Sequence, residues 1–195
     1  MKFQIKSEKH MLALLGLLVW ACNSNNIDIE NMRCEYQATP MDVDSPAPRF
    51  TWNYTTSNEN GTEFSQNSYQ LCIATREQDL GNSSENSWQS DTIYSGIPYA
   101  IYQGAKKLKP RTRYYWQVTA WDKTGDHKIT SPISSFETAQ INQSDWTGVW
   151  ITDNHDKDYP SAPMLRKSFT TQEKIQQARL YVSAAAYYKM TLNGQ

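Results

Sequence analysis

Residues 108–122 read Leu-Lys-Pro-Arg-Thr-Arg-Tyr-Tyr-Trp-Gln-Val-Thr-Ala-Trp-Asp, a turn that leads into an alternating strand. Pro110 fixes φ and ends the preceding strand, and Thr112 can bond to nearby backbone in the turn. Tyr114 then buries its ring, so its hydroxyl needs a partner, usually a backbone group a few residues upstream. This pattern is typical of the corner at which a β-sandwich passes from one sheet to the other.

Alternate residues of the strand share a face, because the side-chain period of a strand is two. One face, which we expect in the core, holds Tyr114, Trp116, Val118 and Ala120, and the other holds Tyr115, Gln117, Thr119 and Trp121. The outward rings of Tyr115 and Trp121 could stack on a sugar. More often such rings are covered by an adjacent domain, which is the interpretation we favour.

The N-terminus predicts export. Three lysines precede an apolar run over residues 11–21, which is shorter than the roughly 20 residues a membrane-spanning helix needs. A basic segment followed by a short apolar one is typical of a signal peptide. Ala21 directly before Cys22 resembles the lipobox of bacterial lipoproteins, so we expect a signal over 1–21, Cys22 as the lipidated first residue and a tether over 22–27. An ordinary signal peptide cut near Ala21 is the alternative.

Composition fits an exported, soluble, aromatic-rich domain. Residues 1–21 hold three lysines and one glutamate, so their removal changes the formal charge from −1 to −3. We expect no basic cluster, which argues against nucleic acid and against a polybasic membrane surface. The two remaining cysteines, Cys34 and Cys72, could pair in an oxidising envelope, but two cysteines show no framework spacing, and we favour free buried thiols.

Short strands separated by turn signals follow one another along the mature chain. We expect strands over 49–54, with Phe50, Trp52 and Tyr54 on one face, and over 69–75, 88–94, 99–102 and 130–138, with Ile133 and Phe136 as the apolar residues of the last. Residues 123–126 read as a hairpin turn and residues 58–67 as a loop. The spacing and the tyrosine corner predict an all-β fold, an immunoglobulin-like sandwich closest to fibronectin type III, over residues 28–139.

A second β unit is expected over residues 140–195. Trp146 and Trp150 are placed near an interdomain seam, and strands are expected over 162–169, 177–183 and 187–194, the last ending in an Asn-Gly turn signal. Three strands cannot close a sandwich, so an edge would stay exposed. We therefore expect the sequence to be truncated within this unit.

Ten blocks in order resemble the N-terminal region of bacterial α-L-rhamnosidases, from about residue 28 to the last. They are Asn31-Met-Arg-Cys-Glu-Tyr36, Asp44-Ser-Pro-Ala-Pro-Arg49, Tyr69-Gln-Leu, Trp88-Gln-Ser-Asp91, Tyr114-Tyr-Trp116, Ser144-Asp-Trp146, Trp150-Ile151, Ala162-Pro-x-Leu-Arg-Lys-x-Phe169, Ala178-Arg-Leu-Tyr-Val182 and Leu192-Asn-Gly194. The resemblance implies inverting glycoside hydrolases that remove terminal L-rhamnose from plant polysaccharides and glycosides. It also implies a fibronectin-like domain, then a jelly-roll domain, which residues 140–195 would begin, then an α/α barrel with the active site.

Inverting hydrolysis needs one carboxyl group to protonate the leaving oxygen and another, ~6.5–9.5 Å away, to activate water. The resemblance puts both in the barrel, so we carry over no catalytic residue and expect no metal and no cofactor. Of the acids present, Asp153, Asp156 and Asp158 with His155 fail the calcium-loop pattern and read as a solvated loop. His127 beside Asp126 has no nucleophile in a matching motif and is not a triad.

Two functions remain open. The chain is either the N-terminal, non-catalytic part of an exported rhamnosidase or a non-catalytic envelope lipoprotein whose sandwich binds glycan or protein. In the first case a rhamnose-containing glycan is the partner of other domains, and the membrane is contacted only through the lipid on Cys22. Tyr114, Trp116 and Trp52 are expected to be structural residues.

Overall fold

The computed structural model describes residues 27–56, 64–153, 158, 162–171 and 174–195. The chain forms two compact units, Met1–Thr147 and Gly148–Gln195. The predicted signal, Cys22 and most of the predicted tether lie outside the described residues.

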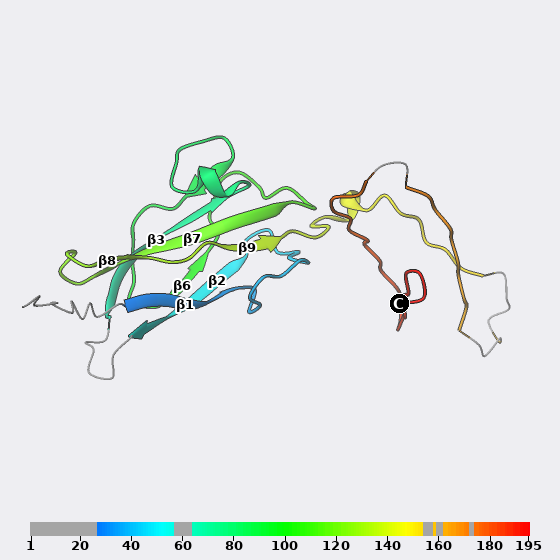
Figure 1. The fold of residues 1–195 in the computed structure, drawn as a ribbon, viewed down its shortest axis with the longest axis horizontal. Coiled ribbons are helices and arrows are strands. Elements are labelled where there is room, and N and C mark those ends of the chain that lie inside the picture. Colours follow the sequence, from blue (N-terminus) through cyan, green and yellow to red (C-terminus); the bar gives the residue numbers. More distant parts are fainter. Residues whose placement is uncertain (1–26, 57–63, 154–157, 159–161, 172–173) are drawn as a thin grey trace, which may run out of the picture. The chain divides into compact units, whose positions relative to one another are not determined.

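The first unit is a sandwich of two antiparallel sheets (Figure 1). The smaller sheet has the order β1-β2-β6 and consists of β1 (Ile27–Cys34), β2 (Arg49–Thr56) and β6 (Tyr99–Ile101). The larger sheet has the path β4-β3-β7-β8, with β5 on β3 and β9 on β7. Its strands are β3 (Gln66–Ala74), β4 (Ser87–Gln89), β5 (Ile93–Tyr94), β7 (Arg113–Asp122), β8 (Lys128–Thr130) and β9 (Ser134–Glu137). The expected all-β, immunoglobulin-like fold is confirmed.

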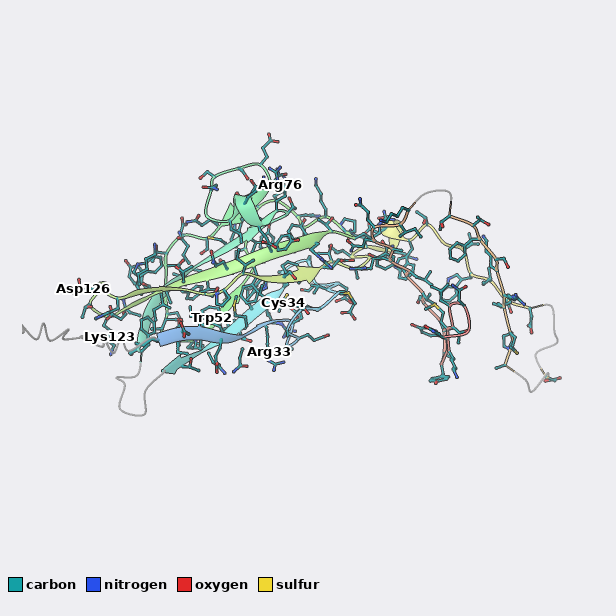
Figure 2. The ribbon with its side chains drawn as sticks, in the orientation of Figure 1. Arg33, Cys34, Trp52, Arg76, Lys123 and Asp126 are labelled. Carbon is teal, nitrogen blue, oxygen red and sulfur yellow. The ribbon has the colours of Figure 1, made fainter. Side chains whose placement is uncertain are left out.

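β7 is the longest strand and runs along the larger sheet. Its residues alternate between buried and half-exposed, with Tyr114, Trp116 and Val118 on the buried face that the period of two assigns to the core. The hairpin turn that follows connects it to β8, as expected from residues 123–126, and Figure 2 shows Lys123 and Asp126 at the tip of that hairpin. β9 pairs with the other end of β7, at Arg113 to Trp116.

The core between the sheets is aromatic. Phe50 lies against Trp116 with ring centroids 4.8 Å apart, and Trp52 meets Tyr69 edge-on at 5.2 Å. Edge and tilted contacts of this kind are the geometry that aromatic quadrupoles favour. Fully buried Trp52 on β2 and Trp116 on β7 therefore join the two sheets.

Gln66 is a buried polar residue at one end of β3, and all of its polar atoms have partners. Its Oε1 accepts from Trp52 Nε1 at 3.2 Å and from the Tyr54 hydroxyl, and its Nε2 donates to the carbonyls of Ser95 at 2.7 Å and Ile97 at 2.9 Å. A buried amide is tolerated when its hydrogen bonds are made. Gln66 thus links β2, β3 and the segment before β6.

Several expected strand limits differ from the structure. The expected strand over 88–94 is two short strands, β4 and β5, and the one over 130–138 is divided into β8 and β9. Ile133 lies between β8 and β9 and is 45% exposed, so its assignment as a core residue is wrong, whereas Phe136 is buried. β3 begins at Gln66, within the segment expected to be a loop, and buries Cys72 and Ala74 as well as its inward face.

β1 was not expected as a strand, because its sequence breaks the period of two. The register shifts between Glu30 and Arg33, and Asn31 has a positive φ of 50°. Such a bulge adds a residue to one strand and moves the following side chains to the other face. Ile29 and Cys34, an odd number of residues apart, can for this reason both face the core.

In the second unit, the described residues of 148–195 form no strand. The segments 162–169, 177–183 and 187–194, expected to be strands, have no strand structure, and their residues are exposed except for the half-buried Tyr181. A strand is held by hydrogen bonds to a neighbouring strand, and none of these segments pairs with another in the described part of the chain. The assignment of residues 140–195 to a jelly-roll-like domain stays a prediction.

Candidate functional site

The corner before β7 is held by a hydrogen bond between side chain and backbone. The backbone N–H of Lys109 donates to the hydroxyl of Tyr114 at 2.8 Å, and burial raises the pKa of that phenol. Thr112 Oγ1 donates to the Pro110 carbonyl at 2.9 Å, and Arg111 has a φ of 53°. The corner therefore presents residues 106–113 as a fixed loop at the start of β7.

The same loop forms one wall of a hollow of about 100 Å³. Trp88 and Tyr102 line it with ring centroids 4.7 Å apart and an edge-on geometry. The Tyr102 hydroxyl donates to the Lys106 carbonyl at 2.5 Å, and Lys106 Nζ donates to the Glu85 carbonyl at 2.9 Å. The first bond fixes the loop 106–113 to Tyr102, and the second connects this loop to the opposite wall at Glu85.

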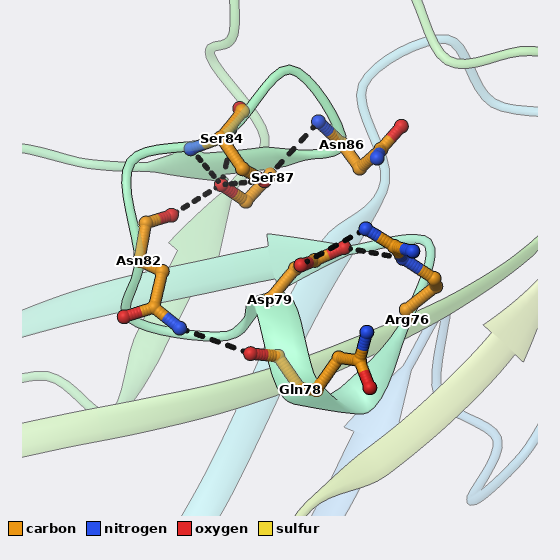
Figure 3. A network of polar contacts seen from close by, with 7 residues as sticks. All are labelled: Arg76, Gln78, Asp79, Asn82, Ser84, Asn86 and Ser87. Atoms are coloured by element: carbon orange, nitrogen blue, oxygen red, sulfur yellow. Dashed lines mark hydrogen bonds and ion pairs between the residues drawn. The ribbon is translucent and has the colours of Figure 1, made fainter.

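That opposite wall belongs to a loop that is ordered by its own polar contacts (Figure 3). Arg76 directly precedes the short 3-10 helix η1 (Glu77–Asp79), and its Nε donates to Asp79, the last residue of that helix, at 2.7 Å. Further on, the Ser87 hydroxyl donates to the Asn82 carbonyl at 2.5 Å, and the backbone of Ser84 donates to Ser87 Oγ at 3.0 Å. The loop is thereby brought into β4, which starts at Ser87 and carries Trp88 into the hollow.

The expectation of a mature chain without a basic cluster is wrong. Five basic residues and no acid occur within residues 106–113. They are Lys106, Lys107, Lys109, Arg111 and Arg113. Of these five residues, only Arg113 makes an ion pair in the described part of the chain, with Glu137 at 3.5 Å. The formal charge of the whole chain hid this run, which a window of eight residues would have found.

Two of the blocks that carry the resemblance to rhamnosidases meet in an ion pair. Arg49 Nη2 lies 2.6 Å from Glu35 Oε2, and the Arg49 backbone N–H also donates to Glu35 at 2.7 Å. The guanidinium lies 4.7 Å from the centre of the Tyr36 ring and donates to the Tyr36 hydroxyl at 2.9 Å. Glu35 and Tyr36 both have positive φ, 47° and 67°, in a tight turn that the pair holds in place.

The carboxyl groups with displaced pKa values are not suited to general acid catalysis. The side-chain hydrogen bond from Arg49 lowers the pKa of Glu35. Burial alone would raise the pKa of Asp122, but hydrogen bonds from His127, Thr124 and Gly125 outweigh it and lower this pKa to about 2. A general acid needs a raised pKa, so both shifts run in the wrong direction.

His127 is placed by Asp122 rather than by its neighbour Asp126. Its Nδ1 lies 2.8 Å from Asp122 Oδ2, at the exposed end of the β7–β8 hairpin. Asp122 also accepts from the backbone N–H of Gly125 at 2.8 Å and so caps the turn. Since the turn needs these bonds, the pairing has a structural explanation.

The acidic segment of the second unit lies only partly in the described residues. Asp153 and Asp158 are described, whereas His155 and Asp156 lie outside the described residues. Within residues 27–56, 64–153, 158, 162–171 and 174–195, no group of three or more His, Cys, Asp or Glu side chains is placed to hold a metal ion. Cys34 and Cys72 are free and buried, and burial raises the pKa of both thiols.

The outward aromatics of β7 lie at its two ends. Tyr115 is half-buried beside Arg76, Gln78 and the exposed Ile133. Trp121 is half-exposed, with Lys128 Nζ 5.8 Å from its ring centre. Cover of either ring by a second domain stays a prediction, as does the seam at Trp146 and Trp150, which are 40% and 77% exposed.

These features define a class of protein, an immunoglobulin-like sandwich with a tyrosine corner. The family model of the Rha78A-like, N-terminal immunoglobulin domain matches residues 29–142. The chain belongs to this family.

Two proteins with similar sequences are both named alpha-L-rhamnosidase. A Formosa agariphila protein called alpha-L-rhamnosidase is 23% identical over 94% of this chain and 22% of its own length. One from Alteromonas sp. (strain LOR) is 27% identical over 90% of the chain and 20% of its own length. The chain thus spans about a fifth of the length of these relatives.

Solved structures agree with the fold. The Streptomyces avermitilis alpha-L-rhamnosidase complexed with L-rhamnose has a TM-score of 0.56 and 28% identity, over 65% of this chain and 12% of that one. The alpha-L-rhamnosidase from Dictyoglumus thermophilum has a TM-score of 0.56 and 27% identity, over 64% and 14%.

Proposed function

We propose that the chain is the N-terminal, non-catalytic part of an exported α-L-rhamnosidase that removes terminal α-L-rhamnose from plant glycans or glycosides. The match of its sandwich to the N-terminal domain family carries this proposal. Relatives called alpha-L-rhamnosidase, each about five times as long as the matched part, support it further. The glycan is then bound and cleaved by other domains, with no cofactor.

The role of the sandwich is to support those domains rather than to react. The segment that leaves it is tied to the corner: the Arg111 N–H donates to the Ala139 carbonyl at 3.1 Å, and the Thr138 N–H donates to the Thr112 carbonyl at 3.0 Å. The Thr138 hydroxyl donates to the Lys109 carbonyl at 2.6 Å. Because three bonds hold this exit, the following residues leave from a defined point.

Export with a lipid on Cys22 is part of the proposal. The basic segment, the apolar run and the Ala21-Cys22 junction support it. In the part of the chain that the structure describes, no helix has the length and apolar character needed to span a bilayer. Labelling of cells with a radioactive fatty acid tests the anchor: the wild type should be marked and Cys22→Ala unmarked. Equal labelling of both would leave an ordinary signal peptide.

The reading frame that encodes this chain gives the wider test. We expect it to continue into several hundred codons for an α/α barrel, and the complete product to release rhamnose from an aryl α-L-rhamnoside. A stop codon soon after Gln195 would instead support the alternative of a non-catalytic envelope lipoprotein. A complete product with no rhamnosidase activity would contradict the proposed enzyme.

A further inference from the structure

We propose that the hollow between Trp88 and the basic loop 106–113 binds an anionic sugar, one that bears a carboxylate or a sulfate group. This site is separate from the proposed rhamnosidase chemistry and does not depend on it. It combines an aromatic wall, hydrogen-bonding groups and cations within one small surface.

The charge of the lining indicates an anion. Lys106, Lys107 and Lys109 line the hollow, and Glu85 is its one acidic lining residue. Lys107 and Lys109 are exposed and make no ion pair in the described part of the chain. An ammonium group without a carboxylate partner can donate charge-assisted hydrogen bonds to a carboxylate or sulfate.

The shape of the lining indicates a sugar rather than a bare ion. The half-buried ring of Trp88 is fixed against Tyr102 and offers an apolar surface, while Asn86, Ser87 and Thr75 supply polar groups around it. Sites for small ligands typically combine an aromatic wall with a few well-placed polar groups. A hollow of about 100 Å³ can receive one edge of a single sugar ring, with the rest of a polymer outside.

The position of the site favours a glycan as its ligand over the membrane to which the proposed lipid on Cys22 would anchor the chain. β1 begins at Ile27, which pairs with Thr56 at the end of β2. Tyr54, also at this end of β2, donates a hydrogen bond to Gln66, and Gln66 pairs with Asp122 at the far end of β7. The basic loop directly precedes Arg113 at the near end. At ~3.3 Å per residue, the strand separates the two ends by about 30 Å.

Affinity electrophoresis of the purified chain tests the proposal with polygalacturonate, dextran sulfate and neutral dextran in the gel. We expect retardation by at least one of the two polyanions, which identifies the acidic group, and none by dextran. Lys107→Gln/Lys109→Gln should weaken binding by roughly tenfold or more, since two charge-assisted bonds are lost. Lys123→Gln/Lys128→Gln removes the same charge from the β7–β8 hairpin, where Figure 2 labels Lys123 and Lys128 begins β8, and should leave binding unchanged.

Other results would overturn the proposal. These are no binding to either polyanion, equal loss in both lysine pairs, or equal retardation by dextran. Tighter binding to phosphatidylglycerol vesicles than to the polyanions, through Lys107 and Lys109, would assign the loop to a membrane. Trp88→Leu should also weaken binding, and unchanged affinity in this variant would exclude the hollow. If Trp88→Leu does not fold, the comparison of the two surface lysine pairs decides alone.

Discussion

The hydroxyl oxygen of Tyr114 accepts a hydrogen bond from the backbone N–H of Lys109, five residues upstream, at 2.8 Å. The bond closes the corner between the two sheets and places the basic loop and the exit at Thr138 side by side. We expect Tyr114→Phe to lower the free energy of unfolding by about 1–3 kcal/mol, because the Lys109 N–H loses its partner. Denaturant melts measure this. Unchanged stability would show that water replaces the hydroxyl without cost.

Trp116 should be the most sensitive residue of β7. It is fully buried, so Trp116→Ala leaves a large cavity and should cost roughly 3–5 kcal/mol. Trp121→Ala, on the outward face, should cost about 1 kcal/mol or less. Trp116→Phe serves as a control, because it keeps a ring and removes an indole N–H that has no hydrogen-bond partner among the described residues. A larger loss in Trp121→Ala than in Trp116→Ala would invert the assignment of the two faces.

Gln66 should tolerate no apolar replacement. Gln66→Leu removes the acceptor of the Tyr54 hydroxyl and the donor to the Ser95 carbonyl. The Trp52 indole keeps its bond to the Tyr54 hydroxyl, and the Ile97 carbonyl keeps its bond from the Tyr99 N–H. We expect a loss of about 2–4 kcal/mol, since unsatisfied buried polar groups cost roughly 1–3 kcal/mol each and part of the site can admit water. Gln70→Leu, which removes one bond to the Ser90 carbonyl, is the matched control and should cost less. Equal losses would mean that Gln66 acts only by filling space.

Glu35 should make the stability of the sandwich depend on pH. Its pKa is lowered in the folded state by Arg49, so the ion pair stabilises the fold above the ordinary carboxyl pKa and is lost as the pH falls through the lowered value. We expect the difference in stability between wild type and Glu35→Gln to be largest near neutral pH and to shrink below about pH 4. Melts of both proteins from pH 7 to pH 2 measure it. A difference that does not vary with pH would assign the effect to the backbone of the turn.

The fold could be predicted where local chemistry decides it. The alternation in β7 and the corner at Pro110 depend on neighbouring residues, and so do the turn at 123–126 and the strand that contains Trp52. The break between β8 and β9 was missed because the apolar side chain of Ile133 suggested a core position within one strand. Ile133 instead lies exposed between the two strands. Burial of Cys72 on the second face of β3 involves a contact with Gly81, which follows η1 and lies outside any local pattern.

Other features could not be predicted because they arise from contacts between distant residues. The bulge at Asn31 shifts the register of β1, and only pairing with β2 shows where Cys34 points. The ion pair of Glu35 with Arg49 joins two blocks across a turn with two positive φ angles, which neither block indicates alone. The hollow at Trp88 forms where a loop before β4 meets the basic loop before β7. By contrast, the basic run itself was present in the sequence.

The most direct test of the central claim, that this sandwich is a non-catalytic part of a rhamnosidase, is hydrolysis of an aryl α-L-rhamnoside by the purified chain. The carboxyl groups of Glu35 and Asp122 have lowered pKa values, a shift opposite to the one a general acid needs. We therefore expect release of the aryl group at the rate of a buffer control. Turnover above that control that is abolished by replacing a single carboxylate within residues 28–195 would contradict the account.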